Sequence, residues 1–139
     1  MGTPTLEKLL ADSGLADKAQ SIGDNLVRLQ WGSAFVIVGV SGSAIVAIAP
    51  LFREVPHTNL SAFYRKLLEH NAYMGGMASF AIQPDGWVIL HAGRALKGID
   101  ASEFATMVSG VGRFADQFDD QLIGEFYAQQ PESTNQAPV

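Results

Sequence analysis

A serine stands among glycines in the segment Gly39-Val40-Ser41-Gly42-Ser43, which approaches the nucleophile elbow of serine hydrolases. That motif needs glycine two residues beyond the serine, and a helix must follow it. Here Ser43 takes the place of the glycine, and the residues that follow are typical of a strand. The sequence therefore favours a serine in a turn over a nucleophile.

A second glycine motif, Gly110-Val111-Gly112-Arg113-Phe114-Ala115, matches the dinucleotide-binding pattern GxGxxA in its letters. The pattern binds a pyrophosphate only where a strand precedes it and a helix begins at it. In this chain it lies inside a predicted helix. We expect its glycines to let another helix or a strand approach closely.

Histidines and carboxylates give no chemical constellation either. His57, His70 and His91 fall in a predicted loop, helix and strand, and no pair has the spacing of metal ligands on a helix. The sequence therefore predicts no metal, no cofactor and no catalytic residues, and we expect a protein that is not an enzyme. An enzyme of unfamiliar type is a third hypothesis, which a bound small molecule would revive.

Acidic residues gather on the last predicted helix at Asp116, Asp119, Asp120 and Glu125. General acid and base chemistry needs two carboxylates in different environments, whereas these residues resemble one solvated face. Such a face could steer a basic partner.

Composition excludes further classes. The 139 residues carry a formal net charge of −5, which argues against binding to a phosphate backbone. The chain has no cysteine, which excludes disulfides and thiolate metal sites. A basic start followed by an apolar run is missing at the N-terminus, so no signal peptide is expected. We expect a cytoplasmic protein.

The most informative feature is the stretch 29–52, which contains no charged residue. About 20 apolar residues can span a bilayer, but a Ser-Gly-Ser turn interrupts this stretch and Pro50 lies near its end. Its many valines and isoleucines favour strands. We therefore predict a hairpin of strands 33–40 and 43–49, and no membrane partner.

Both faces of this hairpin are apolar. A two-residue turn at Ser41-Gly42 would pair Phe35 with Ile48 and Ile37 with Val46 on one face. The other face would carry Val36, Val38, Ile45 and Ala47. Antiparallel sheets usually have one solvated face, so the helices should cover one set and leave the other for a partner; the sequence does not decide which. Trp87 and His91 are further candidates for a partner contact.

Helical spacing and turn residues predict the remaining elements. Helices are expected over about 4–13, 59–74 and 101–126, with a second short helical piece at 15–22. Strands are expected at 25–31, 77–83 and 87–92, the last two joined by Pro84-Asp85-Gly86. The last helix should begin with the capping box Asp100-Ala-Ser-Glu103. Leu60, Phe63, Tyr64, Leu67 and Leu68 form the apolar stripe of the middle helix.

These elements predict an α+β fold, an antiparallel five-stranded sheet with three helices in the order α-β-β-β-α-β-β-α. We expect one domain over 1–127 and a disordered C-terminal tail over 128–139.

The chain resembles the bacterial YbjN-type family of sensory transduction regulators and its relatives, the type III secretion (Tir-type) chaperones, over roughly 24–126. The matching segments are Ala49-Pro50-Leu51, Leu67-Leu68-Glu69-His70-Asn71, 78–90, Leu96-Lys97-Gly98-Ile99-Asp100 and 115–122. The resemblance implies a type III secretion chaperone-like fold in an acidic cytoplasmic homodimer without catalytic residues.

The function that follows is non-enzymatic capture of an apolar segment of a protein partner, either a client or a signalling component. Partner-binding or dimer candidates are Phe35, Ile37, Val46, Ile48, Trp87 and His91. The alternative is a regulatory adaptor that docks through its acidic last helix, without chaperone activity. Salt should weaken that docking steeply.

Overall fold

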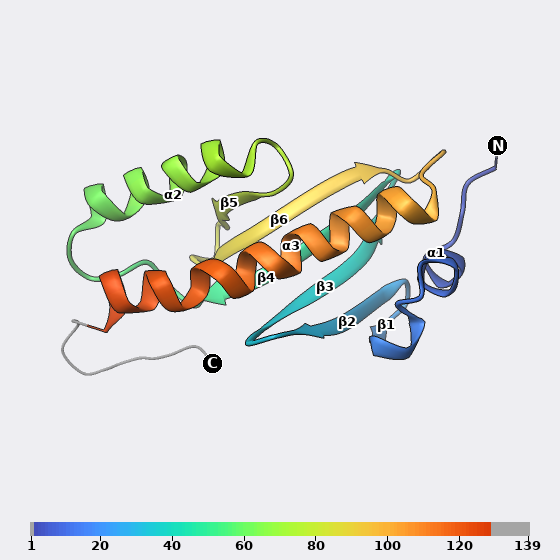
Figure 1. Ribbon diagram of the computed structural model, residues 1–139, viewed down its shortest axis with the longest axis horizontal. Helices are drawn as coiled ribbons and strands as arrows, with labels where there is room; N and C mark the ends of the chain where they lie inside the picture. The colour runs from blue at the N-terminus through green and yellow to red at the C-terminus, as the bar shows by residue number, and fades with distance from the viewer. Residues whose placement is uncertain (1, 129–139) are drawn as a thin grey trace.

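One antiparallel sheet of six strands organises residues 2–128, which are the residues that the computed structural model describes (Figure 1). The strands are β1 (Ala19–Gly23), β2 (Leu26–Trp31), β3 (Ala34–Ser41), β4 (Ala44–Phe52), β5 (Ser79–Ile82) and β6 (Val88–Ala95). The helices are α1 (Leu6–Ser13), α2 (Leu60–Met74) and α3 (Ala101–Leu122), with a 3₁₀ turn η1 (Ala16–Lys18) and a π-helical end η2 (Ile123–Tyr127). Apart from Ala128, the predicted tail lies outside the described residues.

The helices that contact the sheet lie on one of its two sides, where they form a single layer (Figure 1). The strand order is β1-β2-β3-β4-β6-β5, and α3 runs diagonally across β3, β4 and β6 (Figure 1). Helix α2 packs beside β5, and α1 packs against α3. The α+β class and the antiparallel sheet with three helices agree with the prediction, whereas the order of elements has one strand more before α2 than predicted. No helix among residues 2–128 is both long and apolar enough to cross a membrane.

The predicted count of five strands is wrong, because β1 forms where a second helical piece was expected at 15–22. Only residues 16–18 take a helical turn, and residues 19–23 pair with β2. Pairing of Gln20 with Arg28 and of Ser21 with Val27 supplies hydrogen bonds that the weak helical pattern lacked. Tertiary pairing overrode local propensity.

The apolar hairpin forms, but with a turn one residue later than predicted. Ser41 pairs with Ala44 and Ile37 with Ile48, so Gly42-Ser43 is the two-residue turn. Gly42 has φ +60° at the first central position, where a type II′ turn takes glycine. The predicted partners were therefore wrong by two positions. Because side chains alternate with a period of two, the shift left every residue on its predicted face.

Strand β4 also extends beyond the predicted end at Pro50, as far as Phe52. The register with β6 shifts between Pro50 and Phe52. Such a bulge tolerates a residue without an N–H in an interior strand. A proline that looked like a strand end therefore lies within the strand.

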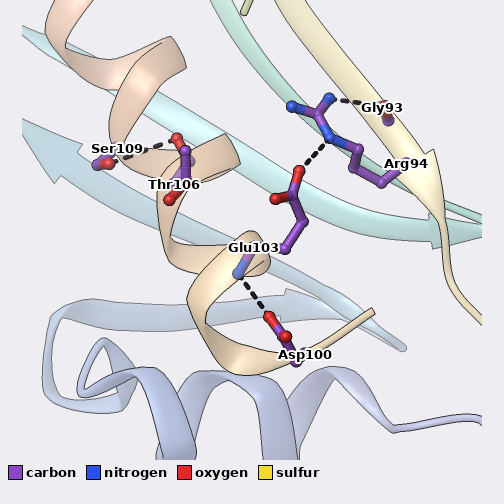
Figure 2. Close-up of polar contacts among 6 residues, drawn as sticks. All are labelled: Gly93, Arg94, Asp100, Glu103, Thr106 and Ser109. Atoms are coloured by element: carbon purple, nitrogen blue, oxygen red, sulfur yellow. Dashed lines mark hydrogen bonds and ion pairs between the residues drawn. The ribbon is translucent and has the colours of Figure 1, made fainter. Parts of the chain in front are cut away.

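The N-terminus of α3 is tied to β6 by a short polar chain (Figure 2). The Asp100 carboxylate accepts the backbone N–H of Glu103 at 2.8 Å, which confirms the predicted cap. The Glu103 carboxylate accepts from Arg94 Nε at 2.7 Å, and Arg94 Nη1 donates to the carbonyl of Gly93. The helix therefore begins at a fixed point over the sheet.

Close approach at Gly112 fixes α3 further along its length. A Cβ built on Gly112 would lie 2.4 Å from the Trp31 ring, so the ring of β2 packs directly on the helix backbone. A Cβ on Gly110 would meet only the end of Met77, at 3.9 Å. The interpretation of the GxGxxA motif as a packing motif is confirmed at Gly112.

The substitution Gly112→Ala should lower the free energy of unfolding by roughly 1–3 kcal/mol, because the Trp31 ring must move. The matched substitution Gly110→Ala should be neutral or stabilising by about 0.5–1 kcal/mol, since alanine favours the helix and has room there. Denaturant unfolding of both variants measures the difference. Equal stabilities would contradict the close packing.

Candidate functional site

The two faces of the sheet differ in what covers them. Val36, Val38, Ile45 and Ala47 are fully buried under the helical layer. The residues between them in the strands are only half-buried, although they are as apolar. This side has no helix of residues 2–128 over it (Figure 1). We call it the open face.

The register aligns the open face into rows across the strands. Arg28 of β2 lies beside Ile37, Ile37 beside Ile48, and Ile48 beside His91. A neighbouring row places Val46 between Gly39 and Gly93. The Leu26 side chain of β2 fills the space over Gly39, where an added Cβ would lie 2.7 Å from Leu26 Cδ1.

A shallow depression of about 350 Å³ lies on the open face. Its lining is Phe35, Ile37, Ile48, Pro50, Gln83, Asp85, Trp87 and Ile89. The floor is aliphatic, and an aromatic ring stands at each side. The one carboxylate, Asp85, accepts the backbone N–H of Trp87 at 3.1 Å, so it belongs to the β5–β6 turn. The depression suits an apolar side chain and contains no set of groups that could carry out a reaction.

The two rings of the depression are each covered by an arginine. The guanidinium of Arg28 lies 4.0 Å from the Phe35 ring centroid, and that of Arg53 lies 5.9 Å from the Trp87 ring centroid. Guanidinium groups stack favourably on aromatic faces. Each ring of the depression therefore has a cation beside it.

All six predicted partner candidates lie on the open face. The structure thus decides between the two sets: Phe35, Ile37, Val46 and Ile48 are on the side without helices. Sequence reasoning missed Pro50, Ile89 and the two arginines. The charges of Arg28 and Arg53 flank the apolar stretch in the sequence, which is a signal that could have drawn attention to them.

A second apolar surface lies on α2. Of its predicted stripe, only Phe63 and Leu67 are buried, whereas Leu60, Tyr64 and Leu68 are exposed. Leu68 is 67% exposed and Tyr73, on the same helix, 69%. Leu60, Tyr64 and Leu68 are spaced by four, so they form a ridge along the helix. Tyr73 follows Leu68 by five residues, and its ring instead contacts Phe114 and Phe118 of α3. We call Leu60, Tyr64 and Leu68 the α2 ridge.

The edge of the sheet next to α2 is partly closed. The backbone N–H of Phe80, in the edge strand β5, donates to the Asn71 side-chain oxygen of α2 at 2.7 Å. An edge donor that already has a partner cannot pair with an added strand. A partner is therefore better accommodated on the open face than at this edge.

The acidic last helix is less free than the sequence suggested. Asp116 accepts both the N–H and the hydroxyl of Ser33, at 2.9 and 2.8 Å, and Asp119 Oδ2 lies 2.6 Å from the same hydroxyl. Asp119 is only 9% exposed, so the expectation of one solvated acidic face is wrong there. Both carboxylates fasten the β2–β3 turn to α3, which disfavours this helix as a docking surface.

The histidines do not come together. His70, which lies in a helix as predicted, stacks on Phe118 of α3 with ring centroids 4.0 Å apart. Its Nε2 is buried without a hydrogen-bond partner among the described residues, and burial lowers its pKa. His57 lies 3.2 Å from Glu54. Within residues 2–128, no three side chains of the metal-binding types are grouped to hold an ion.

Solved structures share this architecture. A chain of the heterodimeric ExoU–SpcU complex from the type III secretion system of Pseudomonas aeruginosa aligns with a TM-score of 0.64 and 17% identity, over 88% of this chain and 98% of that one. A chain of the ExsC–ExsE complex aligns with a TM-score of 0.59 and 15% identity, over 84% and 90%. No family model and no curated protein sequence matches the chain.

At these identities the likeness shows the fold alone. The predicted type III secretion chaperone-like fold is confirmed in its α+β class, its antiparallel sheet and its three helices. The correction is the sixth strand. Membership of the YbjN-type family stays a prediction.

The Ser33 cluster makes a prediction about pH. Burial raises the pKa of Asp119, whereas the Ser33 N–H and then its hydroxyl lower that of Asp116. A carboxyl group whose pKa is raised in the folded protein stabilises the fold most below about pH 3.8. This contribution is lost as the pH rises through the pKa of the folded state. A carboxyl group whose pKa is lowered in the folded protein acts in the opposite direction. Its contribution to stability is present above about pH 3.8 and is lost as the pH falls through the pKa of the folded state.

Relative to the native chain, Asp119→Asn should therefore gain thermal stability as the pH rises from about 4 to 7. Asp116→Asn should lose stability over its own titration range as the pH rises. Thermal melts of the three proteins across pH 3–7 measure both trends. Parallel curves would contradict the assignment.

Proposed function

We propose that this protein binds an apolar segment of a protein partner on the open face of its sheet. The observation that carries the proposal is the uncovered apolar floor around Ile37 and Ile48, with its 350 Å³ depression. Monomeric proteins rarely leave large continuous apolar patches in water, and such patches mark interaction sites. Two solved complexes in which a chain of this fold has a protein partner support the same conclusion.

The open face suits a segment of protein better than a small molecule. The depression is shallow and its lining is mostly apolar, with few polar groups to orient a ligand. Ligand sites are usually concave, with convergent polar groups that fix orientation. A flat apolar sheet surface instead buries the side chains of another chain, at roughly 25 cal/mol per Å² of apolar surface removed from water.

We further propose that the protein forms a homodimer through the α2 ridge. Leu60, Tyr64 and Leu68 are three of the large hydrophobic side chains left exposed among the described residues. A ridge on one helix is self-complementary when two copies meet antiparallel about a two-fold axis. This arrangement would leave the open face of each copy free for the partner.

The substitution Ile37→Asp should abolish partner capture while the fold survives, because Ile37 is half-buried on the open face. Its neighbour Val38 is fully buried under α3. Val38→Asp should therefore cost at least about 4 kcal/mol and remove the cooperative melt. Thermal melts and affinity capture from native lysate compare the two variants.

If Ile37→Asp melts like Val38→Asp, the open face is part of the core and the proposal fails. It fails equally if Ile37→Asp is folded and still captures the same partner.

The substitution Leu68→Glu should convert a dimer into a monomer of 14.9 kDa, because the most exposed residue of the ridge would then carry a charge. Size exclusion with light scattering gives the mass. Ile22→Glu is the matched control, since Ile22 is also exposed but lies on β1, at the opposite edge of the sheet. A native monomer, or a dimer that survives Leu68→Glu, would exclude this interface.

A further inference from the structure

Two unpaired cations border the apolar depression of a chain whose net charge is negative. Among residues 2–128, four other basic side chains are in ion pairs with carboxylates: Lys8, Arg65, Lys66 and Arg94. Arg28 and Arg53 are not in such a pair there; each instead lies over an aromatic ring of the depression. A guanidinium stacked on a ring still presents its N–H groups at its edge.

The strand order places these cations at opposite ends of the apolar strip. Arg28 is on β2 and lies beside Ile37 on the open face. Arg53 follows the end of β4, and its guanidinium lies over Trp87, directly before β6. The strip between them therefore crosses β3, β4 and β6, the strands that carry the floor of the depression.

We propose that the partner segment is an apolar stretch flanked by a carboxylate at each end, one for Arg28 and one for Arg53. This inference rests on the proposed function of the open face. It adds the charge pattern of the partner, which is complementary to the cations Arg28 and Arg53.

The spacing of the strands sets the length of the stretch. From β2 to β6 there are three interstrand spacings, and the row of Arg28 meets β6 at His91, four residues from Trp87. The two cations are therefore roughly 19 Å apart, counted both across and along the strands. An extended segment covers that distance with about six residues, and a helix with about thirteen. The two carboxylates should therefore be separated by one of these lengths.

The two ends should not contribute equally. Asp85 lines the depression next to Trp87, on the side of Arg53, and its carboxylate reduces the positive potential there. Glu54 is also adjacent to Arg53 in the chain and lies 3.2 Å from His57. No acidic residue lines the end with Phe35 and Arg28. Arg28 should therefore make the larger contribution to the charge preference.

The test uses synthetic peptides in which about five or about twelve apolar residues are flanked by glutamate, by serine or by lysine. Fluorescence anisotropy measures their affinity for the full chain at low and high salt. Glutamate flanks should bind about tenfold more tightly than lysine flanks at low salt, and this difference should shrink at high salt.

Arg28→Glu combined with Arg53→Glu should reverse the order of the peptides, and Arg28→Glu alone should have most of the effect. Arg113→Glu is the control for total charge, because Arg113 is exposed on α3, on the other side of the sheet. It should leave the order of the peptides unchanged.

The outcomes separate this inference from the function beneath it. If all peptides bind equally and Ile37→Asp abolishes their binding, the open face captures apolar segments without a charge preference, and the inference is wrong. If no peptide binds, or Ile37→Asp has no effect, the proposed function itself fails. Arginine variants that change self-association instead of peptide affinity would make a second copy the occupant, which also overturns the inference.

Discussion

The fold depends on one imbalance, a sheet with two apolar faces and helices enough for only one. Strand side chains alternate between faces, and β3 and β4 are apolar at nearly every position, so both faces would gain from burial. Helix α3 covers Val36, Val38, Ile45 and Ala47 completely. The opposite face keeps Ile37 and Ile48 half-buried. The same excess that stabilises the sheet leaves a surface that favours association.

The position of α3 is fixed by contacts that only particular residues allow. At its start Asp100 caps the helix and Glu103 pairs with Arg94 (Figure 2). In its middle Gly112 lets the Trp31 ring reach the backbone. Near its end the carboxylates of Asp116 and Asp119 hold Ser33. These contacts hold α3 on one face of the sheet, so the helix does not cover the open face.

Much of this could be predicted from the sequence, because periodicity and turn residues are local signals. The α+β class, the approximate limits of the three helices, the hairpin around Pro84-Asp85-Gly86 and the faces of the apolar hairpin followed from them. Strand β1 could not be predicted, since its pattern is weak and its stability comes from pairing with β2. The choice of the open face was equally out of reach, because two apolar faces are identical in a pattern. The exposed ridge on α2 was missed for a similar reason, as Leu60 and Leu68 look like core residues until the helix is placed.

The open face of the sheet therefore meets water although its residues are apolar. Methyl NMR with a soluble paramagnetic agent measures this most directly, since the agent broadens the signals of accessible methyl groups. We expect strong broadening for Ile37, Val46 and Ile48 and none for Val38 and Ile45. Equal protection of both sets in the monomer would show that the open face is sheltered, and would contradict the account.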